Sequence, residues 1–230
     1  MKLDKRLSAI VKYVPDGAKV ADIGTDHAYL PTVLLLEKTI PFAVVSDVAA
    51  KPCKMAWNTL AMYGLTKVSA VRQGDGLSVI QPKECDCLVF AGMGGITIID
   101  ILQNGYEVAQ SAKRLIFQPM QGADRLREYL CKNNFSIVIE DLVEDGKYLY
   151  DVIVAEPKEG KTYTQAEYII GGWLLEHGHS LLPKQFAKQK GIYKRILDGL
   201  KKSKEMVNSD KFKEIQQVIY ELEELEHEYC

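Results

Sequence analysis

Residues 20–31 decide the fold of this chain, and they read Val20-Ala21-Asp22-Ile23-Gly24-Thr25-Asp26-His27-Ala28-Tyr29-Leu30-Pro31. Val20 and Ile23 favour a short buried strand, and Gly24 allows the backbone to turn where a side chain would clash. Pro31 suits the first turn of a helix, where its missing N–H costs little. A strand, a glycine turn and a helix N-terminus together form a cradle for a nucleotide.

Apolar periodicity on both sides of this stretch predicts alternating strands and helices. The expected strands are 18–23, 42–47, 68–72, 87–91 and 114–118, with helices at 3–14, 28–38, 51–63, 95–102 and 123–133. Two β-rich runs then follow, 135–143 and 148–155, and the Asp145-Gly146 pair between them is a hairpin signal. We therefore predict an α/β fold with a doubly wound, mostly parallel, Rossmann-like sheet and an antiparallel last strand.

The C-terminal part of the chain has a different, purely helical pattern. Apolar residues recur at helical spacing in two segments, Tyr193, Ile196, Leu200 and Val207 in the first and Ile215, Val218, Leu222, Leu225 and Tyr229 in the second. Asn208-Ser209-Asp210 between them is typical of a turn. We expect an antiparallel helical hairpin that packs as a short coiled coil. The predicted domains are residues 1–160 and 161–230.

Composition limits the class of protein. The chain has 230 residues, of which 47% are hydrophobic and 26% charged, as in an ordinary globular protein. No apolar run approaches the roughly 18 residues that span a bilayer, and the first residues lack an apolar signal core, so we expect a cytoplasmic protein without a membrane partner. The five cysteines form no C-x-x-C pair, which argues against a zinc site or a disulfide framework.

Acidic residues follow the predicted strands at their carboxyl ends. Asp22 ends the first strand, Asp47 the second, and Asp75 follows the third, while Ala91-Gly92 follows the fourth. These residues should meet in one crevice, because the carboxyl ends of parallel strands share one edge of the sheet. Asp47 suits a ribose diol, and Asp75 could accept a hydrogen bond from an adenine amine. The alternative is that these acids only cap helices and turns.

The glycine turn argues against a dinucleotide. Asp26 would put negative charge where a pyrophosphate would lie, which fits a ligand without phosphate. S-adenosylmethionine is such a ligand, and its ammonium could bind Asp22 or Asp26 while its carboxylate meets backbone N–H groups of the turn. The residues predicted to bind this cofactor are Asp22, Gly24, Thr25, Asp26, His27, Asp47, Asp75, Gly76, Ala91 and Gly92.

Three motifs carry a resemblance to a known family. The segment Ala21–Pro31, the run Ala91-Gly92-Met93-Gly94-Gly95 and the pair Gln118-Pro119 resemble those of the bacterial tRNA adenine-N1 methyltransferases that modify position 22 of tRNA, the TrmK family. The resemblance extends over essentially the whole chain. It implies a class I methyltransferase fold, S-adenosylmethionine as methyl donor and tRNA as acceptor.

The implied reaction is in-line attack by adenine N1 on the methyl group of the donor. Because this nitrogen carries a free lone pair in neutral adenine, positioning is the main task, after the base has been flipped out of its stack. The candidate catalytic residues are Gly92, Met93, Tyr29 and His27. Alternatively, the glycines only permit a tight turn, His27 caps its helix and Tyr29 packs in the core.

Positive charge gathers near the C-terminus although the net charge is only −2. Phosphate contacts need only well-placed cations, so the lysine-rich segment is the candidate RNA surface, with a solvated helix face as the alternative. The residues predicted to bind RNA are Arg6, Lys184, Lys188, Lys190, Lys194, Arg195, Lys201 and Lys202, and Lys204 continues the run.

Two rival functions remain open at this point. One is a methyltransferase of the same fold that acts on a small molecule or a protein. The other is a non-catalytic module that uses its hairpin to dimerise. We expect no bound metal and leave the oligomeric state open, favouring a monomer over a dimer.

Overall fold

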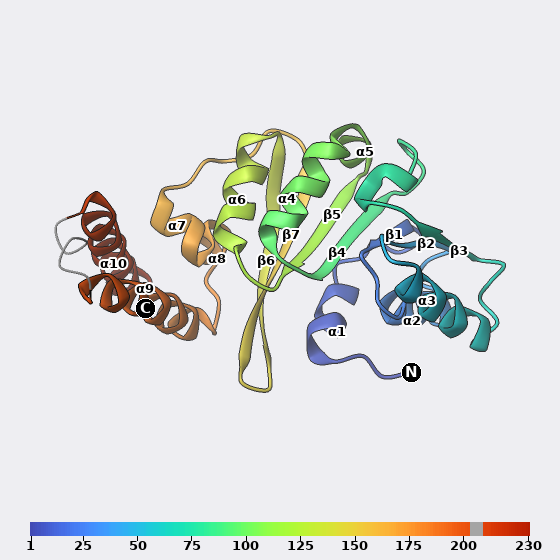
Figure 1. The fold of residues 1–230 in the computed structure, drawn as a ribbon, viewed down its shortest axis with the longest axis horizontal. Coiled ribbons are helices and arrows are strands. Elements are labelled where there is room, and N and C mark those ends of the chain that lie inside the picture. The colour runs from blue at the N-terminus through green and yellow to red at the C-terminus, as the bar shows by residue number, and fades with distance from the viewer. Residues whose placement is uncertain (203–208) are drawn as a thin grey trace. The chain divides into compact units, whose positions relative to one another are not determined.

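A computed structural model describes residues 1–202 and 209–230 of the chain. The described residues form two compact units, Met1–Lys161 and Thr162–Cys230 (Figure 1). Lys204, Val207 and Asn208, which the sequence assigned to the basic run, the apolar seam and the turn, lie outside the described residues.

The first unit contains a seven-stranded sheet in the order β3-β2-β1-β4-β5-β7-β6. Its strands are β1 Lys19–Ile23, β2 Phe42–Asp47, β3 Ser69–Gln73, β4 Cys87–Met93, β5 Arg114–Pro119, β6 Phe135–Asp145 and β7 Tyr148–Pro157. The strands β1 to β5 pair in parallel, and β7 runs antiparallel to both β5 and β6. This confirms the predicted fold class. The antiparallel strand β7 lies one place in from the edge, which β6 occupies.

Helices cover both faces of this sheet (Figure 1). They are α1 Lys5–Val11, α2 Tyr29–Leu36, α3 Ala50–Met62, α4 Gly95–Asn104, α5 Tyr106–Ser111 and α6 Ala123–Lys132, with a short 3-10 helix, η1, at Gly76–Val79. The chain first builds the sheet from β1 toward the β3 edge and then from β4 toward the β6 edge. Because the crossovers are right-handed, the helices of these two halves lie on opposite faces of the sheet. Accordingly α2 contacts α1 and α3, whereas α4 contacts α5 and α6. The strand order reverses between β1 and β4, which is where such folds bind ligands.

A buried charged cluster joins α6 to the β6–β7 hairpin. Arg127 is 1% exposed, and its Nε donates to Glu140 Oε1 at 2.6 Å while Nη2 donates to Asp151 Oδ1 at 2.7 Å. The two carboxylates offset the free-energy cost of burying the guanidinium. Because all three groups are buried, removal of one of them would leave an uncompensated charge inside the protein. The amphipathic pattern of α6 did not indicate this cluster.

The second unit is helical, with α7 Gln165–Ile170, α8 Gly172–His177, α9 Leu182–Lys201 and α10 Asp210–Tyr229. The last two helices pack against each other, so the expected helix pair is confirmed. Lys190 pairs with Glu226, and Lys194 Nζ lies 3.4 Å from Glu223 Oε1. Because the partner number falls as the lysine number rises, α9 and α10 run antiparallel. No helix in the described residues is both long and apolar enough to cross a membrane.

Candidate active site

Two cavities open at the carboxyl edge of the sheet, and Gly24 lines both. The first has a volume of about 350 Å³, and its lining includes Asp4, Arg6, Asp22, Gly24, Thr25, Asp26, His27, Tyr29, Ala91 and Gly92. The second has a volume of about 430 Å³, and its lining includes Gly24, Asp47, Asp75, Gly76, Met93, Thr97, Asp100 and Asn104. Every residue that the sequence predicted to bind the cofactor therefore lines one of these two cavities.

The backbone conformation of Gly24 favours glycine. Its φ is +74°, which lies in the left-handed region, and a Cβ at this position would also displace the terminal methyl group of Met93. The turn is also pinned to the end of β2, because Gly24 N and Thr25 N both donate to Ser46 O, at 2.8 and 3.0 Å. The backbone at the junction of the two cavities is thus fixed, and the Met93 side chain packs directly on it.

Asp22 supplies a buried carboxyl group to the first cavity. It is only 6% exposed. Burial raises its pKa to about 6, and a hydrogen bond with the Thr25 side chain opposes that rise. A carboxylate in such a place is stabilised by a cation, so the first cavity favours a ligand with a positively charged group.

His27 and Tyr29 form a stacked pair at the wall of the first cavity. Their ring centroids are 4.9 Å apart with an interplanar angle of 8°, and His27 Nε2 lies 3.2 Å from Asp26 Oδ2. Tyr29 is 42% exposed, so the alternative of a core role for it is wrong. The residue at the N-cap of α2 is Ala28, which lacks a capping side chain, so His27 does not cap this helix either.

The second cavity collects carboxylates from three elements. Asp47 Oδ1 accepts a hydrogen bond from Ala49 N at 2.8 Å, so Asp47 does support its own turn. Asp75 precedes η1 but makes no side-chain capping bond there. Asp100 joins them from α4, together with Thr97 and Asn104 on the same helix. Sequence reasoning missed these α4 residues, although their i, i+3, i+7 spacing on a helix that follows β4 was an available signal.

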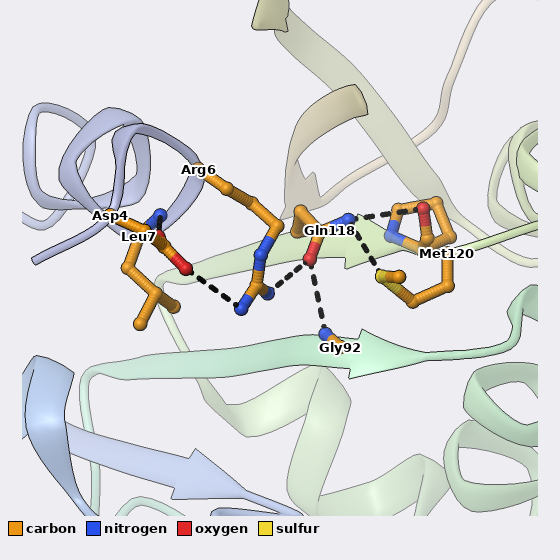
Figure 2. A network of polar contacts seen from close by, with 7 residues as sticks. Asp4, Arg6, Leu7, Gly92, Gln118 and Met120 are labelled. Carbon is orange, nitrogen blue, oxygen red and sulfur yellow. Dashed lines mark hydrogen bonds and ion pairs between the residues drawn. The ribbon is translucent and has the colours of Figure 1, made fainter. Parts of the chain in front are cut away.

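A hydrogen-bond network connects α1, β4 and β5 beside the first cavity (Figure 2). Arg6 Nη1 donates to Gln118 Oε1 at 2.6 Å, and Gly92 N donates to the same oxygen at 3.2 Å. The Gln118 Nε2 group donates to Pro119 O at 3.2 Å. Sequence reasoning grouped Arg6 with the RNA-binding lysines, but the structure places its guanidinium in this network within the first unit. Gln118 was missed as a site residue, although the Gln118-Pro119 motif was noted.

The other residues predicted to bind RNA lie on or just after α9. Several already have partners within the second unit: Lys190 pairs with Glu226, Lys194 with Glu223 and Lys201 with Asp198, and Arg195 Nε donates to Gly191 O. Acidic residues of α10 therefore compensate part of the positive charge on α9. Among the residues that the structure describes, no three His, Cys, Asp or Glu side chains gather where they could hold a metal ion.

Two similarities relate this chain to known proteins. A family described as a methyltransferase domain matches residues 3–153. The tRNA (adenine(22)-N(1))-methyltransferase of Bacillus subtilis is 34% identical over 205 residues, covering 85% of this chain and 86% of that protein.

Solved structures agree with this relationship. The crystal structure of the B. subtilis M1A22 tRNA methyltransferase TrmK superposes with a TM-score of 0.87 at 30% identity, covering 97% of this chain and 98% of that one. A Streptococcus pneumoniae protein described as a putative tRNA (m1A22) methyltransferase, solved in complex with S-adenosyl-L-methionine, gives a TM-score of 0.81 at 28% identity. It covers 95% of this chain and 100% of that chain.

Proposed function

This chain belongs to the family of tRNA (adenine(22)-N(1))-methyltransferases, and we propose that it methylates N1 of an adenine in tRNA, at position 22, with S-adenosylmethionine as donor. The observation that carries the proposal is the pair of cavities that meet at Gly24. An elongated donor can lie across that glycine, with its amino-acid end in the first cavity and its nucleoside in the second. Because the proposed substrate is tRNA, we place the reaction in the cytoplasm.

The side chains present fit this donor. The buried Asp22 carboxylate in the first cavity suits an ammonium group. The N–H groups of Gly24 and Thr25 donate to Ser46 O, so they do not bind the donor carboxylate as the sequence predicted. Asp47 in the second cavity suits a ribose diol, and Asp75 beside it suits the adenine amine. When bound, the donor supplies an electrophilic methyl group on a sulfonium centre.

The acceptor base enters the first cavity after it leaves the tRNA stack. The exposed face of Tyr29, backed by His27, offers an aromatic platform on which a flipped base can stack. Gly92 lines the same cavity and allows close approach of the base to the backbone, while Met93 lines the second cavity and packs against Gly24. The N1 lone pair attacks in line with the leaving sulfur, so catalysis rests on positioning.

The methylated base carries a positive charge, and the first cavity contains groups that stabilise it. Asp26 pairs with His27, and Asp4, at the N-cap of α1, lines the cavity. Carboxylates near the site where positive charge develops stabilise the transition state more than the neutral ground state.

The tRNA body requires a larger positively charged surface than this cavity offers. We assign that role to the basic side chains Lys184, Lys188, Lys190, Lys194, Arg195, Lys201 and Lys202 of the second unit. Contacts of this kind bind phosphates without reading sequence and weaken as the salt concentration rises.

The test is transfer of labelled methyl groups from S-adenosylmethionine to unmodified tRNA, followed by mapping of the modified nucleotide. We expect label in tRNA at a single adenine. Label that enters a protein or a small molecule while tRNA stays unlabelled would support the first rival function. A stable dimer that binds no donor in calorimetry would support the non-catalytic module.

A further inference from the structure

The side-chain amide of Gln118 is fully buried and held in one orientation (Figure 2). Its oxygen accepts two hydrogen bonds, from Arg6 Nη1 at 2.6 Å and from Gly92 N at 3.2 Å. Its nitrogen donates to Pro119 O at 3.2 Å. If the amide were reversed, its N–H₂ group would face the N–H groups of Arg6 and Gly92, and donors would oppose donors. The guanidinium of Arg6 therefore selects the orientation in which Gln118 accepts from Gly92.

Arg6 is itself held in place by α1 and by the sheet. Its Nη2 lies 3.4 Å from Asp4 Oδ2, and Asp4 also caps α1 by accepting from Leu7 N at 2.7 Å. The guanidinium carbon lies 6.0 Å from the centre of the Tyr150 ring on β7. Arg6 on α1 therefore places a fixed positive charge at the end of β5, beside Gln118, which lies 112 positions further along the sequence.

The hydrogen bond from Gly92 N also fixes the direction of the preceding carbonyl group. The Ala91–Gly92 peptide is trans, so its C=O and N–H point in opposite directions. The N–H points toward the side chain of Gln118 on β5, and the carbonyl of Ala91 therefore points away from that side chain. Ala91 lines the first cavity together with Gly24 and Asp22.

We propose that Arg6 and Gln118 are positioning residues that aim the Ala91 carbonyl at the exocyclic amine of the target adenine, so that adenine is selected and its N1 is presented to the donor. This inference rests on the proposed function. The amine of adenine is bonded to the ring carbon next to N1, so one hydrogen bond to the amine fixes both its position and that of N1. Guanine has an oxygen in place of the amine and a proton on N1, so the same carbonyl would repel it.

The proposed hydrogen bond strengthens during the reaction. As N1 gains the methyl group, positive charge spreads through the ring to the amine, which becomes a better donor. A neutral carbonyl that is fixed beforehand therefore stabilises the transition state more than the bound substrate. Loss of its alignment should lower kcat and leave the KM for tRNA and the affinity for the donor nearly unchanged.

The experiment compares two tRNA substrates in three proteins. One substrate carries adenosine at the target position, and the other carries purine riboside, in which hydrogen replaces the amine. The proteins are the unmodified chain, Arg6→Lys, which keeps the charge but not the forked geometry, and Gln118→Met, which conserves volume but removes the amide. Single-turnover rates are measured with saturating S-adenosylmethionine.

We expect each variant to methylate the adenosine substrate about 100-fold more slowly, as a small misplacement of reacting groups can cause. The purine substrate should be slowed far less, so the rate for adenosine divided by the rate for purine should fall in each variant. Comparing this ratio between a variant and the unmodified chain cancels the intrinsic difference in reactivity between the two bases. The double variant should be no slower than either single variant, because both changes remove the same alignment.

Arg114→Lys is the matched control. Arg114 also lies on the sheet and bonds to a side chain, Glu156 Oε1 at 2.8 Å, but it does not line either cavity. It should keep the rate ratio of the unmodified chain. Donor binding and thermal unfolding report on folding, and Arg6→Lys carries the test alone if Gln118→Met does not fold.

Equal slowing of both substrates in Arg6→Lys, with the rate ratio preserved, would overturn the inference. So would a rise in the KM for tRNA at unchanged kcat, because that is the effect of a lost phosphate contact. If the unmodified chain methylates neither substrate, the proposed function fails, and that outcome is distinct from both of these.

Discussion

Asp22 is the residue whose charge state should control donor binding. Burial raises the pKa of its carboxyl group to about 6. Above that pH the group is a carboxylate and attracts the donor ammonium, whereas below it the group is protonated and neutral. We therefore predict that donor affinity falls about tenfold as the pH is lowered from about 7 to about 5, since about nine-tenths of a group with this pKa is ionised at the first value and about one-tenth at the second.

Calorimetry with S-adenosylmethionine across this range measures the effect. The titrations use a His27→Gln background, so that Asp22 is compared without the imidazole that lines the same cavity. In that background, Asp22→Asn should bind weakly at every pH and lose most of the dependence. A pH profile that Asp22→Asn leaves unchanged would show that Asp22 does not bind the ammonium.

At the level of single residues, the sequence predicted which residues line the two cavities better than it predicted the contacts that hold Gly92. Asp22, Gly24 and Asp47 could be predicted because they lie at or directly after the carboxyl ends of β1 and β2, and local pattern fixes where strands end. Arg6 and Gln118 could not be brought together in this way, because their contact depends on where α1 packs relative to β5. Nothing local in the sequence determines that placement.

At the level of elements, strand and helix types were predictable because each has a clear apolar period. The expected strand 42–47 and the helix 51–63 agree with β2 and α3 to within one residue at each end. The helix expected at 3–14 is shorter, Lys5–Val11, although the buried Val14 belongs to the same apolar pattern. The position of β7 between β5 and β6 follows from long-range pairing, which the hairpin signal at Asp145-Gly146 does not specify.

The buried charge cluster of α6 gives a prediction about stability. Arg127→Met should lower the free energy of unfolding by about 3–5 kcal/mol, because it leaves Glu140 and Asp151 buried without their cation. Urea unfolding followed by circular dichroism measures this change. The loss should weaken the packing of α6 on the β6–β7 hairpin, and none of the three residues lines either cavity.

Arg125→Met is the control for that experiment. Arg125 lies on the same helix, its side chain is 62% exposed, and its ion pairs with Asp124 and Glu128 are long, at 3.8 and 3.9 Å. Its replacement should change stability by no more than about 0.5 kcal/mol. Equal effects at the two positions would mean that the buried cluster contributes no more than a surface ion pair.

At the scale of the whole molecule, the two units have different proposed tasks. The first contains both cavities, and the second carries the basic face of α9. We predict that reversing the charge of Lys188, Lys194 and Lys201 to Glu raises the KM for tRNA at least tenfold while donor affinity stays constant, because phosphate contacts are lost and neither cavity is changed. The dependence of tRNA binding on salt concentration should also become weaker.

A variant with the same change in net charge controls for non-specific repulsion. Lys132, Lys211 and Lys213 lie outside α9, on α6 and α10. Their reversal to Glu should raise the KM for tRNA much less. If both triple variants bind tRNA equally well, α9 is not the RNA surface.

The central claim is that N1 of an adenine in tRNA attacks the donor methyl group. The most direct test replaces the target adenosine by 1-deazaadenosine, which keeps the amine and the ring but has carbon in place of N1. Methyl transfer from labelled S-adenosylmethionine is then compared with transfer to unmodified tRNA. The account predicts efficient transfer to unmodified tRNA, recovered as N1-methyladenosine, and no transfer to the substituted tRNA. Undiminished transfer to the 1-deazaadenosine tRNA would contradict it.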